Sequence, residues 1–269
     1  MHASLTFYIV MSVAVTILGL SKGGFAGIGM VSTPMVALVT DPVTAAGLML
    51  PVMLVQDPVA VFLYRRSFDR RLLVTMIPGG AVGIVAAYLL ASSMPEWGIQ
   101  CALGVVSLIF SVWQLVIHAK GAPALAANYS FDKLLGIGAG AAGGFASAVA
   151  HAGSPPFQIY VWPKRLAKEV YVGTSVMYFA ALNAMKLPSY AALGLFSLDH
   201  LLTSAIFVPV AVLSSWLGVR LVRRVDVRGF NFVVTIILLL ISFVLLGQAW
   251  HEAETARSDP SRPIAHLTN

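Results

Sequence analysis

GLSKGGFAGIG, residues 19–29, interrupts an apolar run that extends from Leu5 to Val39. A continuous membrane helix gains nothing from so many glycines, because glycine loosens helical backbone. A lysine at bilayer depth is also unfavourable, by at least about 2.5 kcal/mol on insertion scales. Irregular backbone at that depth persists only where protein or a polar cavity covers it. The stretch therefore predicts a broken helix segment in a membrane protein, with Lys22 at the break.

A second glycine-rich stretch, GAGAAGGFAS at residues 138–147, interrupts a later apolar segment at residues 134–162. Both stretches contain Gly-Gly-Phe-Ala, at 23–26 and at 143–146. We therefore expect a second helix break here. We interpret the two breaks as facing halves of one substrate site.

The composition defines the class of protein. Hydrophobic residues make up 58% of the 269 residues and charged residues only 10%. A soluble domain carries roughly 25% charged residues, so we expect an all-α, multi-pass membrane protein in contact with the lipid bilayer. The net charge of +6 does not indicate nucleic acid, because the arginines fall in short loops between apolar spans, where they orient membrane proteins.

Sequence motifs for catalysis are absent. The chain has no HExxH, no GxSxG and no cluster of histidines and carboxylates within its spans, so an enzyme is not expected. The single cysteine, Cys101, excludes an internal disulfide and a metal site built from cysteines. We expect neither a cofactor nor a metal.

The chain is organised as one pattern written twice. Six simple spans are expected besides the two broken segments, at residues 43–64, 72–91, 97–118, 168–187, 200–222 and 229–250. The chain then divides into a first repeat (1–120), a linker (121–133), a second repeat (134–250) and a polar C-terminal tail (251–269). Internal duplication of this kind is frequent in transporters.

The basic loops exchange places between the repeats. In the first repeat arginines lie at 65–71 and the next loop has none, whereas in the second repeat the loop at 187–199 has none and arginines lie at 220–228. Inverted repeats explain the exchange if each broken segment is a re-entrant hairpin followed by three transmembrane helices. Broken (split) helices that cross fully are the alternative.

With hairpins, one face of the membrane collects most of the cations. They are Arg65, Arg66, Arg70, Arg71, Lys120, Lys133, Lys164, Arg165, Lys168, Arg220, Arg223, Arg224 and Arg228. The positive-inside rule makes these loops cytoplasmic and places both termini outside. The sequence is compatible with a homo-oligomer, because lipid-facing and partner-facing apolar surfaces have the same composition.

Three longer stretches resemble a known family. They are GLSKGGFAGIGMVSTPMVAL (19–38), DPVTAAGLMLPVMLVQDPVAVFLYRR (41–66) and GAAGGFASAVAHAGSPPFQIYVWPKRLAKEVYVGTS (140–175). Over residues 15–246 the chain resembles the sulfite exporter TauE/SafE family of membrane anion transporters. The resemblance implies movement of sulfur-containing anions such as sulfite or organosulfonates, usually outward across a bacterial inner membrane.

Lys22 is the first candidate for contact with the solute. It lies at the first break, where the amides of Gly23 and Gly24 are expected to face the same solute, and a cation beside a helix N-terminus suits an anion. The alternative is a lysine that extends to the membrane interface. We favour the functional interpretation, because ionisable groups inside membranes are usually functional.

The second break supplies Ser147, His151 and Ser154. Positions 147 and 151 share a helical face, and hydroxyl and imidazole donors suit the oxygens of a sulfonate or sulfite. His151 is either a carrier of a coupled proton, since imidazole titrates near neutral pH, or a satisfied packing residue.

Asp57 and Asn183 occupy equivalent positions in the spans that follow the broken segments. Asp57 either pairs with Lys22 or Lys186 to stabilise a kink at Pro58, or accepts a proton during turnover. Asn183 and Lys186, one turn further on, are expected to contact the solute. The alternative for Lys186 is a position at the membrane interface.

These residues favour a secondary transporter in which two repeats alternate access to a site near the middle of the membrane. A passive anion channel or a carboxylate transporter would use the same features. A membrane sensor without transport is the least favoured hypothesis, because it leaves the duplicated site without a purpose.

Overall fold

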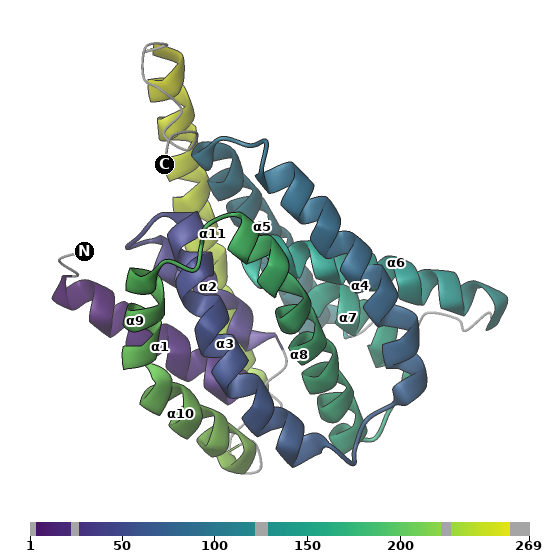
Figure 1. Cartoon of the computed structure of the whole chain (residues 1–269). Coiled ribbons are helices and arrows are strands. Elements are labelled where there is room, and N and C mark those ends of the chain that lie inside the picture. Colours follow the sequence, from purple (N-terminus) through teal and green to yellow (C-terminus); the bar gives the residue numbers. More distant parts are fainter. Residues whose placement is uncertain (1–3, 23–26, 122–128, 222–226, 259–269) are drawn as a thin grey trace.

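The computed structural model describes residues 4–22, 27–121, 129–221 and 227–258, and within these ranges the chain forms helices and no strand (Figure 1). The first half contains α1 (Leu5–Lys22), η1 (Ile28–Val31), α2 (Ser32–Ala37), α3 (Pro42–Tyr64), α4 (Arg70–Ala91) and α5 (Glu96–Lys120). The second half contains α6 (Tyr129–Ala150), α7 (Ser154–Val161), η2 (Trp162–Lys164), α8 (Lys168–Ala192), α9 (Leu198–Ile206), α10 (Val208–Leu221) and α11 (Val227–Ser258). Each half therefore contains a broken segment, which is followed by α3, α4 and α5 in the first half and by α8, the shorter α9 and α10, and α11 in the second.

Six of the described helices are long and apolar enough to cross a membrane, and the count is seven if α9 and α10 form one span bent by 49°. The protein is thus a multi-pass membrane protein. The bend lies at Phe207, two residues before Pro209, inside the single span expected at 200–222. Helix α8 falls outside the six because its composition is more polar, and its buried polar residues include Thr174, Asn183 and Lys186.

The ends of three elements differ clearly from the expected boundaries. Helix α8 continues to Ala192, beyond the expected end at 187. Helix α6 begins at Tyr129, so the last residues of the expected linker already belong to a helix. Helix α11 continues to Ser258, into the stretch expected as a polar tail.

The first broken segment folds back on itself. Gly27 has φ 94°, a left-handed conformation that glycine adopts readily, and η1 and α2 then return alongside α1. The Ser32 Oγ donates to the Ala14 carbonyl at 2.9 Å, and Gly29 lies against the Ser21 side chain. We call α1, η1 and α2 the first hairpin.

The second broken segment also folds back, but its break is not where the glycines predicted it. Helix α6 runs without interruption through residues 138–147, and the chain turns at His151–Gly153 before α7 begins. The Ala152 amide donates to the Ala146 carbonyl at 3.1 Å, which closes the turn. We call α6, α7 and η2 the second hairpin.

The glycines of α6 serve close helix packing instead. A Cβ at Gly140 would meet the Met76 carbonyl, and a Cβ at Gly144 would meet the Gly80 carbonyl, both on α4. Small residues let membrane helices approach until their backbones touch. The prediction of a break at 138–147 is wrong because a glycine pattern that loosens a lone helix is equally the pattern of a tight helix pair.

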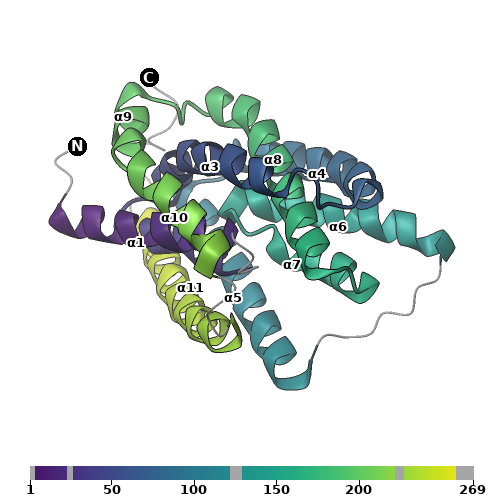
Figure 2. The ribbon, with the colours of Figure 1, turned by 90° about the horizontal axis from the view of Figure 1, so that it is seen from below.

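The two halves interlock. The first hairpin packs through α1 on α10 of the second half, and the second hairpin packs through α6 on α4 of the first half (Figures 1 and 2). Helices α3 and α8 pack on each other, as do α5 and α11. The contacts are therefore symmetric between the halves: α1 on α10 corresponds to α6 on α4, and the pairs α3–α8 and α5–α11 each join equivalent helices.

Helices α3 and α8, which follow the two hairpins, run antiparallel. The start of α3 lies near the end of α8, where Gly47 faces the Leu195 carbonyl. The loop after α3 lies near the start of α8, where the Asp69 amide donates to the Thr174 Oγ1 at 2.8 Å. The loop from α3 to α4 and the end of α10 both lie at the lower end of Figure 1.

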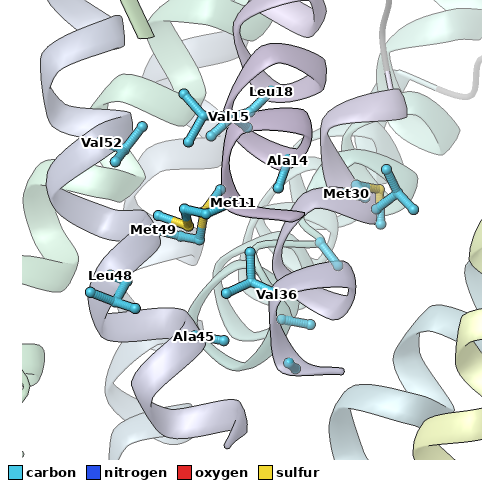
Figure 3. Close-up of a cluster of buried hydrophobic side chains, with 14 of the residues drawn as sticks. Met11, Ala14, Val15, Leu18, Met30, Val36, Ala45, Leu48, Met49 and Val52 are labelled. Carbon is cyan, nitrogen blue, oxygen red and sulfur yellow. The ribbon is translucent and has the colours of Figure 1, made fainter. Parts of the chain in front are cut away.

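Apolar side chains hold each hairpin in place. Figure 3 shows Met11 of α1 meeting Met49 of α3, with Val36 of α2 beside them, and all three are fully buried. Around the second hairpin, the rings of Phe157 and Tyr178 stack with centroids 5.4 Å apart. Each fully buried side chain of this size contributes roughly 1.5–3 kcal/mol relative to exposure in water, and inside a membrane the gain comes from packing instead.

Candidate functional site

Lys22 ends α1 and lies inside the protein, with 9% of its surface exposed. Its Nζ is 2.6 Å from the Asp57 Oδ1 on α3, and Asp57 is only 4% exposed. Lys22 is the last residue of α1, where the helix dipole favours a cation. It does not extend to the membrane interface.

Asp57 also binds the second half of the molecule. Its Oδ2 accepts a hydrogen bond of 2.7 Å from the Asn183 Nδ2 on α8. The two pseudo-equivalent residues thus meet where α3 and α8 cross. One carboxylate joins a lysine of the first half to an amide of the second, which is one of the pairings considered for Asp57 from the sequence.

Lys186 is completely buried, so it is not an interfacial residue. Its Nζ donates to the carbonyl and the Oγ of Ser147 on α6, at 3.2 Å and 3.3 Å. Within the described ranges Lys186 takes part in no ion pair. A buried ammonium group without a carboxylate is unfavourable, and this leaves the site with a cation that is only solvated by neutral oxygens.

His151 occupies the turn of the second hairpin in an unusual state. Its φ is 52°, a left-handed conformation that a residue other than glycine rarely adopts. The ring is 8% exposed, and neither ring nitrogen has a hydrogen-bond partner among the described residues. Its neighbour is the ring of Tyr190, edge-on at 6.1 Å. Strain together with unsatisfied nitrogens is typical of a residue held in place for function.

A cavity of about 70 Å³ lies between the two hairpins. Five of the residues expected to bind solute line it: Lys22, Ser147, His151, Ser154 and Asn183. A single water needs roughly 10–15 Å³ measured in this way, so the cavity has room for a solute of only a few heavy atoms. Apolar groups, Phe157 and Phe179 among them, complete its wall.

The remaining expected residues fall into two groups. Asp57 and Lys186 do not line the cavity themselves, but each is bonded to residues that do. Asp57 binds Lys22 and Asn183, and Lys186 binds Ser147. Gly23 and Gly24 lie outside the described residues.

The sequence analysis missed several polar groups of the cavity. Ser21, Gln158 and Ser175 line it as well, and Gln158 is buried next to Gly27 of the first hairpin. A signal existed for Gln158, because an amide within the apolar sequence FQIYVW needs a polar neighbour. Serines carry no such signal, because they bond to the preceding turn of their own helix wherever they occur.

Chemically, the site offers donors on most sides and one carboxylate, which is already occupied. Ammonium, amide, hydroxyl and imidazole groups surround a small space, a set that suits the oxygens of an anion. No group of three histidine, cysteine or carboxylate side chains in the described part of the chain is placed to hold a metal ion.

A family-level comparison identifies a match over most of the chain. The family described as sulfite exporter TauE/SafE matches residues 11–245, a range that includes both hairpins and the cavity. Comparison with curated proteins and with solved structures gives no match.

Proposed function

The chain belongs to the sulfite exporter TauE/SafE family, a family of membrane transporters, and from that premise we propose that it exports small sulfur-containing anions such as sulfite or organosulfonates. The observation that carries the proposal is the small cavity between the hairpins, with Lys22 in its wall and Lys186 behind Ser147. A buried cation without a carboxylate favours a bound anion, because the anion replaces the lost hydration of the ammonium group.

Each polar group is assigned a role in holding the solute. Lys22 and Asn183 approach it from the side of Asp57, and Ser147 approaches it from the side of Lys186. The ring N–H of His151 and the hydroxyl of Ser154 provide further donors. An oxyanion with three oxygens offers acceptors in several directions, which matches donors from four separate helices and the turn of the second hairpin.

Alternating access would use the interlocked hairpins. Each hairpin packs mainly on a helix of the opposite half, α1 on α10 and α6 on α4, through contacts rich in small residues. We propose that the two halves are inverted repeats, which the antiparallel course of α3 and α8 supports, and that rocking of one hairpin against the other opens the cavity to each side in turn.

Orientation and coupling complete the proposal. The arginine-rich loop after α3 and the end of α10 lie at one end of the molecule, which we propose faces the cytoplasm of a bacterium, with the termini outside. Asp57 and His151 are the candidates for a coupled proton. In the conformation described, Asp57 is bonded to Lys22 and Asn183, which is the arrangement expected if its role is structural and not proton transfer.

The test is transport by the purified protein in liposomes. Sulfite, a sulfonate, thiosulfate and a carboxylate are each loaded on one side, with and without a pH gradient. We expect sulfite or sulfonate movement that is lost in the Lys22→Ala protein. Accumulation against a solute gradient, or movement driven by the pH gradient, identifies a coupled transporter, whereas downhill movement that ignores the pH gradient agrees with a channel. The absence of any anion movement rejects the proposal.

A further inference from the structure

With Lys22, Asp57 and Lys186 ionised and His151 neutral, the charges around the cavity sum to one. Lys22 and Asp57 form an ion pair, which contributes no net charge, and the protonated Lys186 adds one positive charge with no described carboxylate within ion-pair distance. His151 is the one histidine in the cavity wall, and with a neutral ring it leaves this sum unchanged. The other polar groups of the wall are hydroxyls and amides.

Burial makes this sum matter. Lys22, Asp57 and Lys186 are exposed by 9%, 4% and 0%, so bulk water does not screen them. In such surroundings a charge that remains uncompensated is far more unfavourable than in water, and a second excess charge is worse again. The occupied site is therefore most stable when the solute brings the net charge to zero.

From this balance we infer that the site selects solutes carrying a single negative charge. The inference rests on the proposed function and narrows its substrate class to small monoanions, such as a sulfonate or the singly charged form of sulfite. Asp57 acts as the specificity-determining residue, because its carboxylate neutralises one of the two lysines and so excludes a dianion. The volume of about 70 Å³ suits a solute of a few heavy atoms.

Three probes of nearly equal size and shape separate charge from shape. Dimethyl sulfone is neutral, methanesulfonate carries one negative charge and sulfate carries two, and none of them changes its charge near neutral pH. Binding of each to the purified protein in detergent is measured by calorimetry at one fixed pH. For the unmodified protein we expect methanesulfonate to bind about tenfold or more tightly than either of the others.

Substitutions that preserve side-chain size then move the charge sum in both directions. Asp57→Asn raises the sum to two and should shift the ratio of sulfate to methanesulfonate affinity at least about tenfold towards sulfate. Lys186→Gln and Asn183→Asp each lower the sum to zero and should shift preference towards dimethyl sulfone. If one substitution prevents folding, the others still test the inference, because each predicts a direction of its own.

A matched control is available in the same chain. Asp132 pairs with Lys164 at the same distance of 2.6 Å as Asp57 with Lys22, but outside the cavity wall. Asp132→Asn should leave the order of the three probes unchanged.

The outcomes separate the inference from the proposed function. If Asp57→Asn protein is folded and transports anions with an unchanged ratio of affinities, the charge inference is wrong while anion transport stands. Preference of the unmodified protein for sulfate likewise overturns it. If the unmodified protein neither binds an anion nor moves one across the liposome membrane, the proposed function itself fails.

Discussion

The two hairpins contain the same kind of ion pair in opposite places. In the first hairpin Lys22 at the tip reaches Asp57 on another helix, whereas in the second hairpin Lys164 joins Asp132 at the base of the same hairpin. Both pairs measure 2.6 Å, but the side chains of the first are 10% and 6% exposed and those of the second 23% and 38%. Equal geometry therefore serves different purposes, because burial and not distance sets what an ion pair contributes.

The tips themselves differ in the same sense. The tip of the first hairpin ends in a lysine that already has a carboxylate, and the tip of the second holds His151, whose ring nitrogens have no partner among the described residues. Lys186 lies behind the second tip with only Ser147 to bind. The unpaired polar groups, His151 and Lys186, thus lie at or behind the tip of the second hairpin. The charged group at the first hairpin, Lys22, is neutralised by Asp57.

The largest expected difference is in transport. Lys22→Ala should lower the rate of anion movement in liposomes by about a hundredfold or more, because loss of roughly 3 kcal/mol of interaction corresponds to that factor. Lys164→Ala removes the other lysine and should retain most of the rate. Equal losses in two folded proteins would remove the distinction between tip and base.

The next largest difference is expected in the free energy of unfolding when each of the two aspartates is replaced. Asp57→Ala leaves a buried ammonium group unpaired and should lower the free energy of unfolding by about 3–5 kcal/mol. Asp132→Ala breaks a half-exposed pair and should lower it by about 0–1 kcal/mol. Denaturant unfolding in detergent micelles measures both, and a smaller loss for Asp57→Ala than for Asp132→Ala would contradict the assignment.

Helix packing in the second hairpin gives a smaller effect. Gly144→Ala places a Cβ against the Gly80 carbonyl and should destabilise the protein by about 1–3 kcal/mol, because the backbones of α4 and α6 must separate. Gly138 on the same helix has open space at its Cβ, so Gly138→Ala should be neutral or stabilising by up to about 1 kcal/mol. If thermal unfolding shows equal destabilisation by the two, close packing does not explain the glycines.

The smallest effect concerns the base of the second hairpin. Tyr160→Phe removes a hydrogen bond of 3.2 Å to the Asp132 Oδ2 and should lower stability by about 0.5–1.5 kcal/mol without changing which solutes are carried. The same proteins serve for unfolding and for transport measurements. A changed order of solutes would show that the base of the hairpin communicates with the cavity.

Much of the arrangement was predictable from the sequence. The helices around residues 43–64, 72–91 and 97–118 lie within one to two residues of their expected ends, because long apolar runs between loops are strong signals. The first break was also predictable, since a lysine between glycines does not fit a simple span. The second break was misplaced because glycines at 138–147 pack α6 on α4, a contact that no single-chain pattern distinguishes from a break.

The cavity was predictable only in part. Lys22, His151 and Asn183 were found because polar groups inside apolar runs require an explanation, and they line one space as expected. Gln158 and Ser175 were missed. The sequence also left open whether Lys186 lies at the membrane interface or in the protein interior, because the burial of a residue depends on helices distant in the sequence.

The sequence by itself determined the membrane class, the order of the helices and the identity of most polar residues near the cavity, because hydrophobicity and charge are local properties of the chain. Only the tertiary structure decided which lysine has a carboxylate partner and which does not. Asp57 reaches Lys22 and Asn183 across 35 and 126 residues of sequence, and Lys186 reaches Ser147 across 39. Charge compensation inside a membrane depends on such distances in space, and the packing of the hairpins on opposite halves sets them.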